Sequence, residues 1–249
     1  MGEWFSRFFD GLYARVLSDA AGDPRATDEA RIVKKLLRLR KGQRVLDVPC
    51  GKGRLTIPLA RMGLAMTGVD FTAAYLRRAR RAARQEGLDI RFVESDMREI
   101  AFDGEFDAAF NWFGSFGYFS DADNLAFCQR VLRALKPGGR FLIEGINKSW
   151  LLNHFREHDE SLHGRVRIAT TNRWDAATNR MHSTWVFTDG KSLERHTIVM
   201  RIFNGSEMRA VLRQAGFTDI RLYPRPPVGP FTRHSRRLIA VAQRPAARG

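Results

Sequence analysis

The chain has 249 residues, 44% of them hydrophobic, which is enough for one α/β domain with an insert and a substantial core. It has no stretch near the roughly 18 apolar residues of a membrane span and no apolar secretion signal at its start, so we expect a soluble cytoplasmic protein. The net charge of +15 fits either a basic face for nucleic acid, anionic lipid or an acidic substrate, or arginines spread over a solvated surface.

Two helices are predicted before the first strand. Residues 5–17 place their apolar side chains on one helical face, and a second helical pattern covers Asp28–Leu39. The side chains on the first helical face are Phe5, Phe8, Phe9, Leu12 and Val16. We expect residues 1–40 to form a helical cap on the domain that follows.

Short apolar strands then alternate with helices. The predicted strands are Arg44–Val48, Met66–Asp70, Ile90–Glu94, Phe106–Phe110 and Arg140–Gly145. The predicted helices are one that begins near Arg54, Ala73–Glu86 and Asp121–Leu135. Pro137 and the two glycines after it end the last of these helices. This alternation is typical of a mainly parallel sheet that helices cover on both faces.

The pattern changes after the fifth strand. Residues 151–204 contain three stretches of alternating polar and apolar residues and a tight-turn signal at Asp189–Gly190, which predict a small antiparallel β insert. These stretches are Arg165–Trp174, Arg180–Thr188 and Ser192–Phe203. Residues 205–249 then predict a helix between Ser206 and Gly216, followed by strands at Phe217–Tyr223 and Arg237–Ala242. With the core at residues 41–150, the expected fold is a doubly wound, mainly parallel seven-stranded α/β sheet.

A glycine-rich turn joins the first strand to the next helix, within Val45–Gly53. Such a turn lets a ligand approach the backbone at the carboxyl edge of the sheet. Asp47, at the end of the strand, would repel a pyrophosphate but suits a cationic ligand. Asp70 ends the second strand, where folds of this type place an acid that receives ribose hydroxyls. S-adenosylmethionine (SAM), a nucleoside with a sulfonium and an ammonium group, meets both requirements.

These residues resemble the class I SAM-dependent methyltransferases, which have a Rossmann-like fold. The resemblance covers residues Gln43 to Gly145, and Ser206–Phe217 shows a weaker match. The matching motifs are Val45–Gly53, Gly68–Phe71, Glu94–Met97 and Leu135–Ile143. The resemblance implies that SAM is the cofactor and that Asp47, Gly51 and Gly53 hold its methionine end. It implies that Asp70 holds the ribose and that Phe71, Asp96 and Met97 contact the adenine. Asn111 is a further cofactor-binding residue that the resemblance implies.

The loop 111–119 follows the fourth strand and borders the methyl group in such folds. Asn111 is followed by Trp112 and Phe113, so the loop lacks the Asn-Pro-Pro-Tyr type of motif that marks methylation of a planar amine. The layout is similar to small-molecule N-methyltransferases acting on glycine and amino sugars, in which inserted strands cover the acceptor and an N-terminal segment closes over the cofactor. That likeness places five residues near the acceptor: Tyr13, Phe116, Tyr118, Trp150 and His154, with Tyr118 and His154 as candidate bases.

We predict that the chain transfers a methyl group from SAM to an amine or hydroxyl of a small molecule. An RNA methyltransferase is one alternative, because residues 191–249 and the helix Ala73–Glu86 are rich in arginine. A protein that binds SAM without catalysis and acts through a partner is another. Cys50 and Cys128 lack metal-ligand spacing, so we expect core thiols and no metal. The insert is expected to be a lid over the acceptor, and its edge could also form a homodimer.

Overall fold

The computed structural model describes residues 8–9, 11–16, 24–190 and 192–247. Its core is a seven-stranded sheet with the order β10-β11-β5-β4-β1-β2-β3. These strands are β1 (Arg44–Asp47), β2 (Ala65–Asp70), β3 (Arg91–Glu94), β4 (Phe106–Asn111), β5 (Leu135–Ile146), β10 (Thr218–Tyr223) and β11 (Arg237–Gln243). Strands β1 to β5 are parallel, and β11 is antiparallel to both of its neighbours. The structure thus confirms the predicted doubly wound, Rossmann-like α/β fold.

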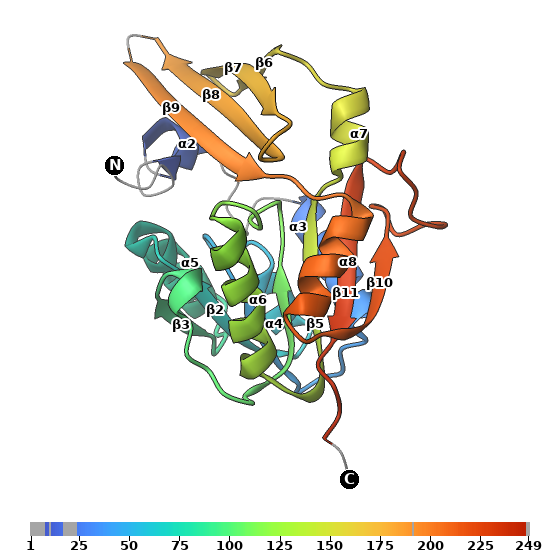
Figure 1. Cartoon of the computed structure of the whole chain (residues 1–249). Coiled ribbons are helices and arrows are strands. Elements are labelled where there is room, and N and C mark those ends of the chain that lie inside the picture. The colour runs from blue at the N-terminus through green and yellow to red at the C-terminus, as the bar shows by residue number, and fades with distance from the viewer. Residues whose placement is uncertain (1–7, 10, 17–23, 191, 248–249) are drawn as a thin grey trace.

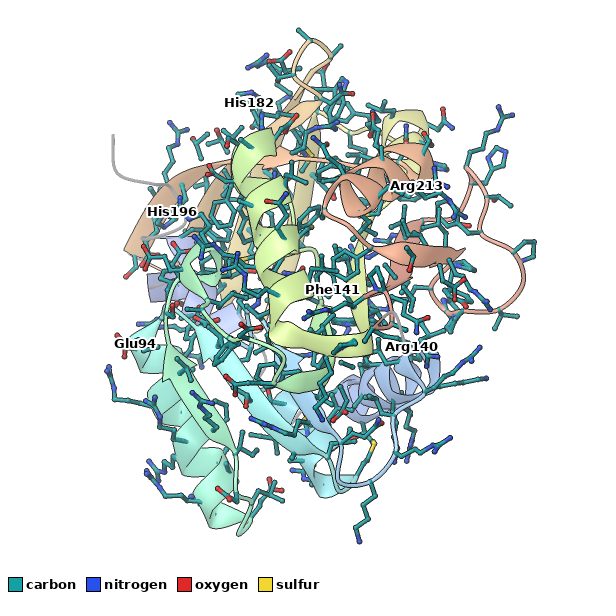
Figure 2. All side chains as sticks on the ribbon, turned by 60° about the horizontal axis from the view of Figure 1, so that its bottom comes forward. Glu94, Arg140, Phe141, His182, His196 and Arg213 are labelled. Carbon is teal, nitrogen blue, oxygen red and sulfur yellow. The ribbon has the colours of Figure 1, made fainter. Side chains whose placement is uncertain are left out.

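Helices cover both faces of this sheet (Figure 1). One face carries α3 (Pro24–Leu37), α4 (Thr56–Arg61) and α5 (Ala73–Gln85), and the other carries α6 (Asp121–Ala134), α8 (Gly205–Gln214) and a 3-10 helix, η2 (Met97–Glu99). Phe141, near the middle of the sheet in Figure 2, contacts the rings of Phe127 and Phe217. Within the described residues, no helix combines the length and apolarity needed to cross a membrane.

The insert is an antiparallel sheet of four strands, β6 (His158–His163), β7 (Val166–Asp175), β8 (Arg180–Asp189) and β9 (Ser192–Arg201). One face is packed, because Ile168 and Phe187 are buried against the N-terminal segment. His196 lies on this face, 5.7 Å from the ring of Phe8, whereas His182 lies on the opposite face of the sheet (Figure 2). The predicted alternation between a packed face and a wet face is therefore present in the structure.

The N-terminal segment bridges the core and the insert. Of the predicted helix at 5–17, the structure describes α2 (Gly11–Val16) and the buried Phe8, while Phe5 and Leu17 lie outside the described residues. The Leu12 N–H donates to Glu194 Oε2 of the insert at 2.9 Å. On the core side, the ammonium of Lys52 donates to the carbonyl of Ala14 at 2.7 Å. This segment is thus fixed from both sides across the carboxyl edge of the core sheet.

Several element boundaries differ from the prediction. Helix α3 begins at Pro24 instead of Asp28, since proline is well suited to the first turn of a helix. Helix α8 is capped by Asn204, not by Ser206, because the Asn204 side chain and Glu207 form a reciprocal capping box. Strand β5 begins at Leu135 and runs through the Pro-Gly-Gly stretch that was expected to separate the helix from the strand.

Three elements were not predicted, namely the short 3-10 helix η2, strand β6 and helix α7. Strand β6 lacks an alternating pattern, and all of its residues are exposed, so its sequence gives no strand signal. Helix α7 (Lys148–Asn153) has only six residues, which is too short for a clear helical period. The insert therefore has four strands where three were predicted.

The insert is joined to the loop that follows β4. The Arg201 N–H at the end of β9 donates to the carbonyl of Gly117 at 2.8 Å, and Gly117 has a positive φ of 110°. Arg180, at the start of β8, donates to the Phe119 carbonyl at 3.0 Å and to Asp121 at 2.9 Å. The base of the insert is consequently held beside the predicted acceptor loop.

Candidate functional site

A cavity of about 650 Å³ lies at the carboxyl edge of β1, β2, β4 and β5. Its wall combines Asp47 and Asp70 from the core, Tyr13 from α2, and Met181 and Trp185 from the insert. Figure 1 shows the insert and α2 together above this edge of the sheet. Ligands of open α/β sheets bind at this edge, which makes the cavity the candidate site.

The glycine turn after β1 forms the floor of the cavity. Asp47 is 3% exposed and accepts a hydrogen bond of 2.6 Å from the Thr56 hydroxyl. Burial raises the pKa of Asp47 to about 8, the Thr56 bond opposes this shift, and the charge of Asp70 adds to it. At Gly51, φ is 55° and a Cβ would meet no atom within 4 Å, so the backbone is open to the cavity. Gly53 instead packs against α5 and does not line the cavity.

Asp70 ties the end of β2 to the glycine turn. Its two oxygens accept the N–H groups of Gly51 and Thr72, each at 2.8 Å. Burial raises the pKa of Asp70, and these two hydrogen bonds oppose the shift. A carboxylate has about four lone-pair positions, so two remain for a ligand after these bonds are made.

The predicted adenine contacts follow β2 and β3. Phe71, Asp96 and Met97 all line the cavity, together with Ser95. Burial raises the pKa of Asp96, but hydrogen bonds and the charge of Arg98 lower it by more, so this carboxylate is ionised and paired. The two partners of the ion pair are separated by 2.7 Å. The structure thus brings these three residues to the same wall as Asp70.

Asn111, at the end of β4, is fully buried and does not line the cavity, although it was predicted beside the cofactor. Its amide nitrogen donates to the carbonyl of Val48 at 2.9 Å, so it links β4 to the glycine turn. Within the described part of the chain its Oδ1 has no hydrogen-bond partner. Cys50 also lies beside this turn, and burial raises the pKa of its thiol, which fits a neutral core thiol.

Three of the five predicted acceptor residues line the cavity, namely Tyr13, Phe116 and Tyr118. Burial raises the pKa of Tyr118 to about 12 and raises the pKa of Tyr13 even further. Both phenols are therefore protonated near neutral pH. Tyr118 can donate a hydrogen bond to a ligand but is a poor general base.

Trp150 and His154 do not line the cavity. They lie on and just after α7, where the two rings stack at 4.4 Å and the His154 Nδ1 contacts the Trp150 carbonyl at 2.9 Å. The His154 side chain is exposed. The sequence placed both residues with the acceptor because they follow β5, but helix α7 turns them away from the cavity.

Sequence reasoning missed two groups of residues that line the cavity. The first comes from the insert and includes Met200 of β9, for which the alternating pattern was a signal, and His163 of β6, where that pattern is absent. The second is a set of arginines, Arg25, Arg54 and Arg237, from three distant parts of the chain. The cavity is thus acidic at the ends of β1 and β2 and basic toward α3 and β11.

Comparison with known proteins agrees with this geometry. Residues 45–139 match a family model described as a methyltransferase domain. A demethylmenaquinone methyltransferase from Thermus thermophilus is 36% identical over 104 residues, which are 41% of this chain and 46% of that protein. The chain spans less than half the length of the first curated relatives that it matches.

Solved structures match over nearly the whole chain. A SAM-dependent methyltransferase from Clostridium acetobutylicum has a TM-score of 0.74 at 18% identity, covering 97% of this chain and 98% of that one. The SAM-bound amino pentose methyltransferase CalS10 from Micromonospora echinaspora has a TM-score of 0.66 at 23% identity, covering 94% and 97%. The insert and the N-terminal segment are therefore within the shared fold, since the coverage extends beyond residues 45–139.

Proposed function

We propose that the protein is a SAM-dependent methyltransferase, because residues 45–139 match a methyltransferase-domain model and a solved SAM-dependent methyltransferase has the same fold. Its acceptor is the amine or hydroxyl of a small molecule. The observation that carries this proposal is the cavity, whose wall includes both the cofactor motifs and the segments from α2 and the insert. Its volume of about 650 Å³ is in the range of small-molecule sites.

The residues present fit SAM. Gly51 leaves its backbone open to the cavity, Asp47 provides a carboxylate for a cation, and Asp70 keeps two lone pairs for ribose hydroxyls. Phe71 and Met97 provide apolar surface for a purine ring. SAM supplies a methyl group that is already activated, so the chain needs to bind, orient and exclude water. We propose residues 1–40 as the cap and 151–204 as the lid that provide this enclosure.

The acceptor atom needs a free lone pair when it binds in the cavity, because it attacks the methyl group as a nucleophile. Tyr118 and Tyr13 hold their protons near neutral pH, so neither phenol removes a proton from the acceptor. A neutral amine needs no base, which favours nitrogen over hydroxyl oxygen. The amino pentose methyltransferase with the same fold is named for a substrate of this class, which supports the same preference.

The direct test is calorimetry with SAM and S-adenosylhomocysteine (SAH), with NADH as a control ligand. We expect SAM and SAH to bind with one site per chain and NADH not to bind, because Thr56 replaces the third glycine of the dinucleotide-binding turn. Formation of SAH from SAM in the presence of candidate amines then distinguishes an enzyme from a protein that only binds SAM. Absence of SAM binding would refute the proposed function.

SAM binding should release a proton from Asp47 at pH 7. The pKa of Asp47 in the free protein is about 8, so the carboxyl is mostly protonated at pH 7. A bound cation favours the carboxylate, so affinity should rise with pH up to about 8 and then level off. The released proton is taken up by the buffer. Calorimetry at pH 7 in phosphate and in Tris should therefore give binding enthalpies that differ by nearly the difference between the ionisation enthalpies of the two buffers. Asp47→Asn should abolish the difference, and equal enthalpies for the wild type would contradict the prediction.

RNA is the weaker candidate for the acceptor. The exposed arginines of α5, such as Arg77, Arg81 and Arg84, lie outside the cavity wall, so they do not lead a strand of RNA to the site. We expect little tRNA binding at about 150 mM salt and only weak, steeply salt-dependent association below it. Filter binding across a salt series measures this. Tight, saturable binding to a folded RNA at the higher salt would reverse the ranking.

The predicted homodimer through the insert stays a prediction. Strand β6 is an edge strand in which Leu162 is 71% exposed, and Leu193 of β9 is 67% exposed. Exposed edges of this kind can pair with a second chain.

A further inference from the structure

A buried cluster of charges lies beside the cavity on the α3 side of the sheet. Its two carboxylates, Glu29 of α3 and Glu144 of β5, are 5% and 0% exposed. Arg225 joins them, donating to Glu144 at 3.0 Å and also to Glu29. Glu29 further accepts from Arg54 at 2.6 Å and from the Trp112 indole at 2.8 Å. The pKa of Glu29 is lowered, because the arginine partners outweigh the burial that would raise it.

Glu144 is held by a second arginine that belongs to the cavity wall. Arg237 donates from Nε at 2.6 Å and from Nη2 at 2.7 Å, a two-point contact with the carboxylate. The Phe113 N–H donates to the same carboxylate at 3.0 Å. Every hydrogen-bond partner of Glu144 among the described residues is therefore a donor. The cluster joins the guanidinium groups of Arg54, Arg225 and Arg237 to two carboxylates.

Arg237 has donors left for a ligand that enters the cavity. Its contact with Glu144 uses one edge of the guanidinium, and among the described residues Nη1 has no hydrogen-bond partner. A guanidinium has five N–H donors, so the Nη1 edge can still bind a second planar anion at two points. Gly114 and Gly145 line the cavity near Arg237, and a Cβ at Gly145 would meet no atom within 4 Å. There is thus open space next to this arginine.

Arg237 belongs to the acceptor side of the cavity, not to the cofactor side. The sheet order places β4 and β5 between β1, which carries Asp47, and β11, which carries Arg237. Three strand spacings correspond to roughly 14 Å between the backbones of β1 and β11. The long side chain of Arg237 extends from β11 toward the loop after β4, where a Cβ at Gly114 would lie 3.7 Å from Nη2. The proposed ribose and adenine contacts lie still further away, at the ends of β2 and β3.

We propose that the methyl acceptor carries a carboxylate, which binds the free edge of Arg237. This inference rests on the proposed function and adds a substrate class to it. A carboxylate is planar and negatively charged, which suits the remaining fork of the guanidinium. Glu29 and Glu144 hold the arginines in place, so the anion meets donors that are already oriented. The acceptor is thus a small amino acid or another amine with an acid group.

The test is ligand-observed NMR on the complex of the protein with SAH, using small amines offered in pairs as the carboxylate and as the primary amide. Glycine with glycinamide and 4-aminobenzoate with 4-aminobenzamide are suitable pairs. We expect carboxylates to bind at least tenfold more tightly than their amides. Arg237→Gln should remove this preference. Arg237→Lys keeps the charge and the ion pair with Glu144, and should retain only part of the preference if the free edge of the guanidinium matters.

Arg236→Gln is the matched control, because Arg236 precedes Arg237 but stacks on Trp150, outside the cavity wall. It should leave the preference intact, and all three variants should bind SAH as the wild type does. If Arg237→Gln does not fold, the lysine variant decides alone. The proposal is overturned if no carboxylate binds, if amides bind equally well, or if the preference persists without Arg237. A parallel loss of SAH affinity would overturn it too, because Arg237 would then bind the cofactor's own carboxylate. Failure of the wild type to bind SAM would instead refute the proposed function.

Discussion

Replacing Asp70 with alanine should weaken the binding of SAM and SAH at least tenfold. Each hydrogen bond from a hydroxyl to a charged group contributes about 1.5–3 kcal/mol, and about 1.4 kcal/mol corresponds to a factor of ten in affinity. Asp70 also accepts the N–H groups of Gly51 and Thr72, so its removal loosens the glycine turn as well. Both effects act in the same direction, and calorimetry with SAH measures their sum.

A double-mutant cycle separates the two effects. The 2′-deoxy analogue of SAH lacks one of the hydroxyls that Asp70 is proposed to bind. If the contact exists, the losses from Asp70→Ala and from the missing hydroxyl should not add, because each removes the same interaction. Additive losses would show that Asp70 acts only through the turn. Asp89→Ala is the matched control, since Asp89 is exposed and lies outside the cavity wall. Unchanged affinity in Asp70→Ala would remove Asp70 from the site.

The sequence was informative where structure depends on local pattern. Buried parallel strands appear as short apolar runs, and the glycine turn requires a positive φ at Gly51, so both could be recognised without any tertiary contact. The proposed covering role of residues 151–204 rests on their position after the fifth strand and on their alternation, and it stays a prediction. Strand β6 has neither signal, because it pairs with β7 by its backbone while its side chains face water.

The charged cluster could not be predicted, since it depends on contacts between distant residues. Arg225 and Glu29 are 196 positions apart, and each reads locally as an ordinary surface charge. Glu144 occupies a strand that otherwise looks like an apolar core strand. The error at Trp150 and His154 has the opposite origin. Their distance in sequence from β5 was short, but the direction in which α7 leaves the sheet is set by packing and not by spacing.

The insert contributes to the cavity through one face only. Met181, Trp185 and Met200 line the cavity from the packed face, while the residues between them, such as Val186 and Val199, occupy the other face. The same packed face holds Phe8 of the N-terminal segment. Loss of the insert would therefore remove the wall beside the acceptor and also free one side of α2, while the glycine turn and Asp70 would remain on the core sheet.

Replacing residues 158–200 with a short Gly/Ser linker should lower turnover at least a hundredfold, while SAM affinity falls by about tenfold or less. An acceptor that is no longer enclosed loses both orientation and protection from water, and these effects are large. The linker keeps Arg201, whose N–H is bonded to Gly117, so the loop after β4 keeps its anchor. SAH release measures turnover, calorimetry measures SAM affinity, and thermal melting checks the fold. Val186→Ser with Val199→Ser, on the face away from the cavity, should leave turnover unchanged. If SAM binding is abolished in a folded variant, the insert is part of the cofactor site and not a lid.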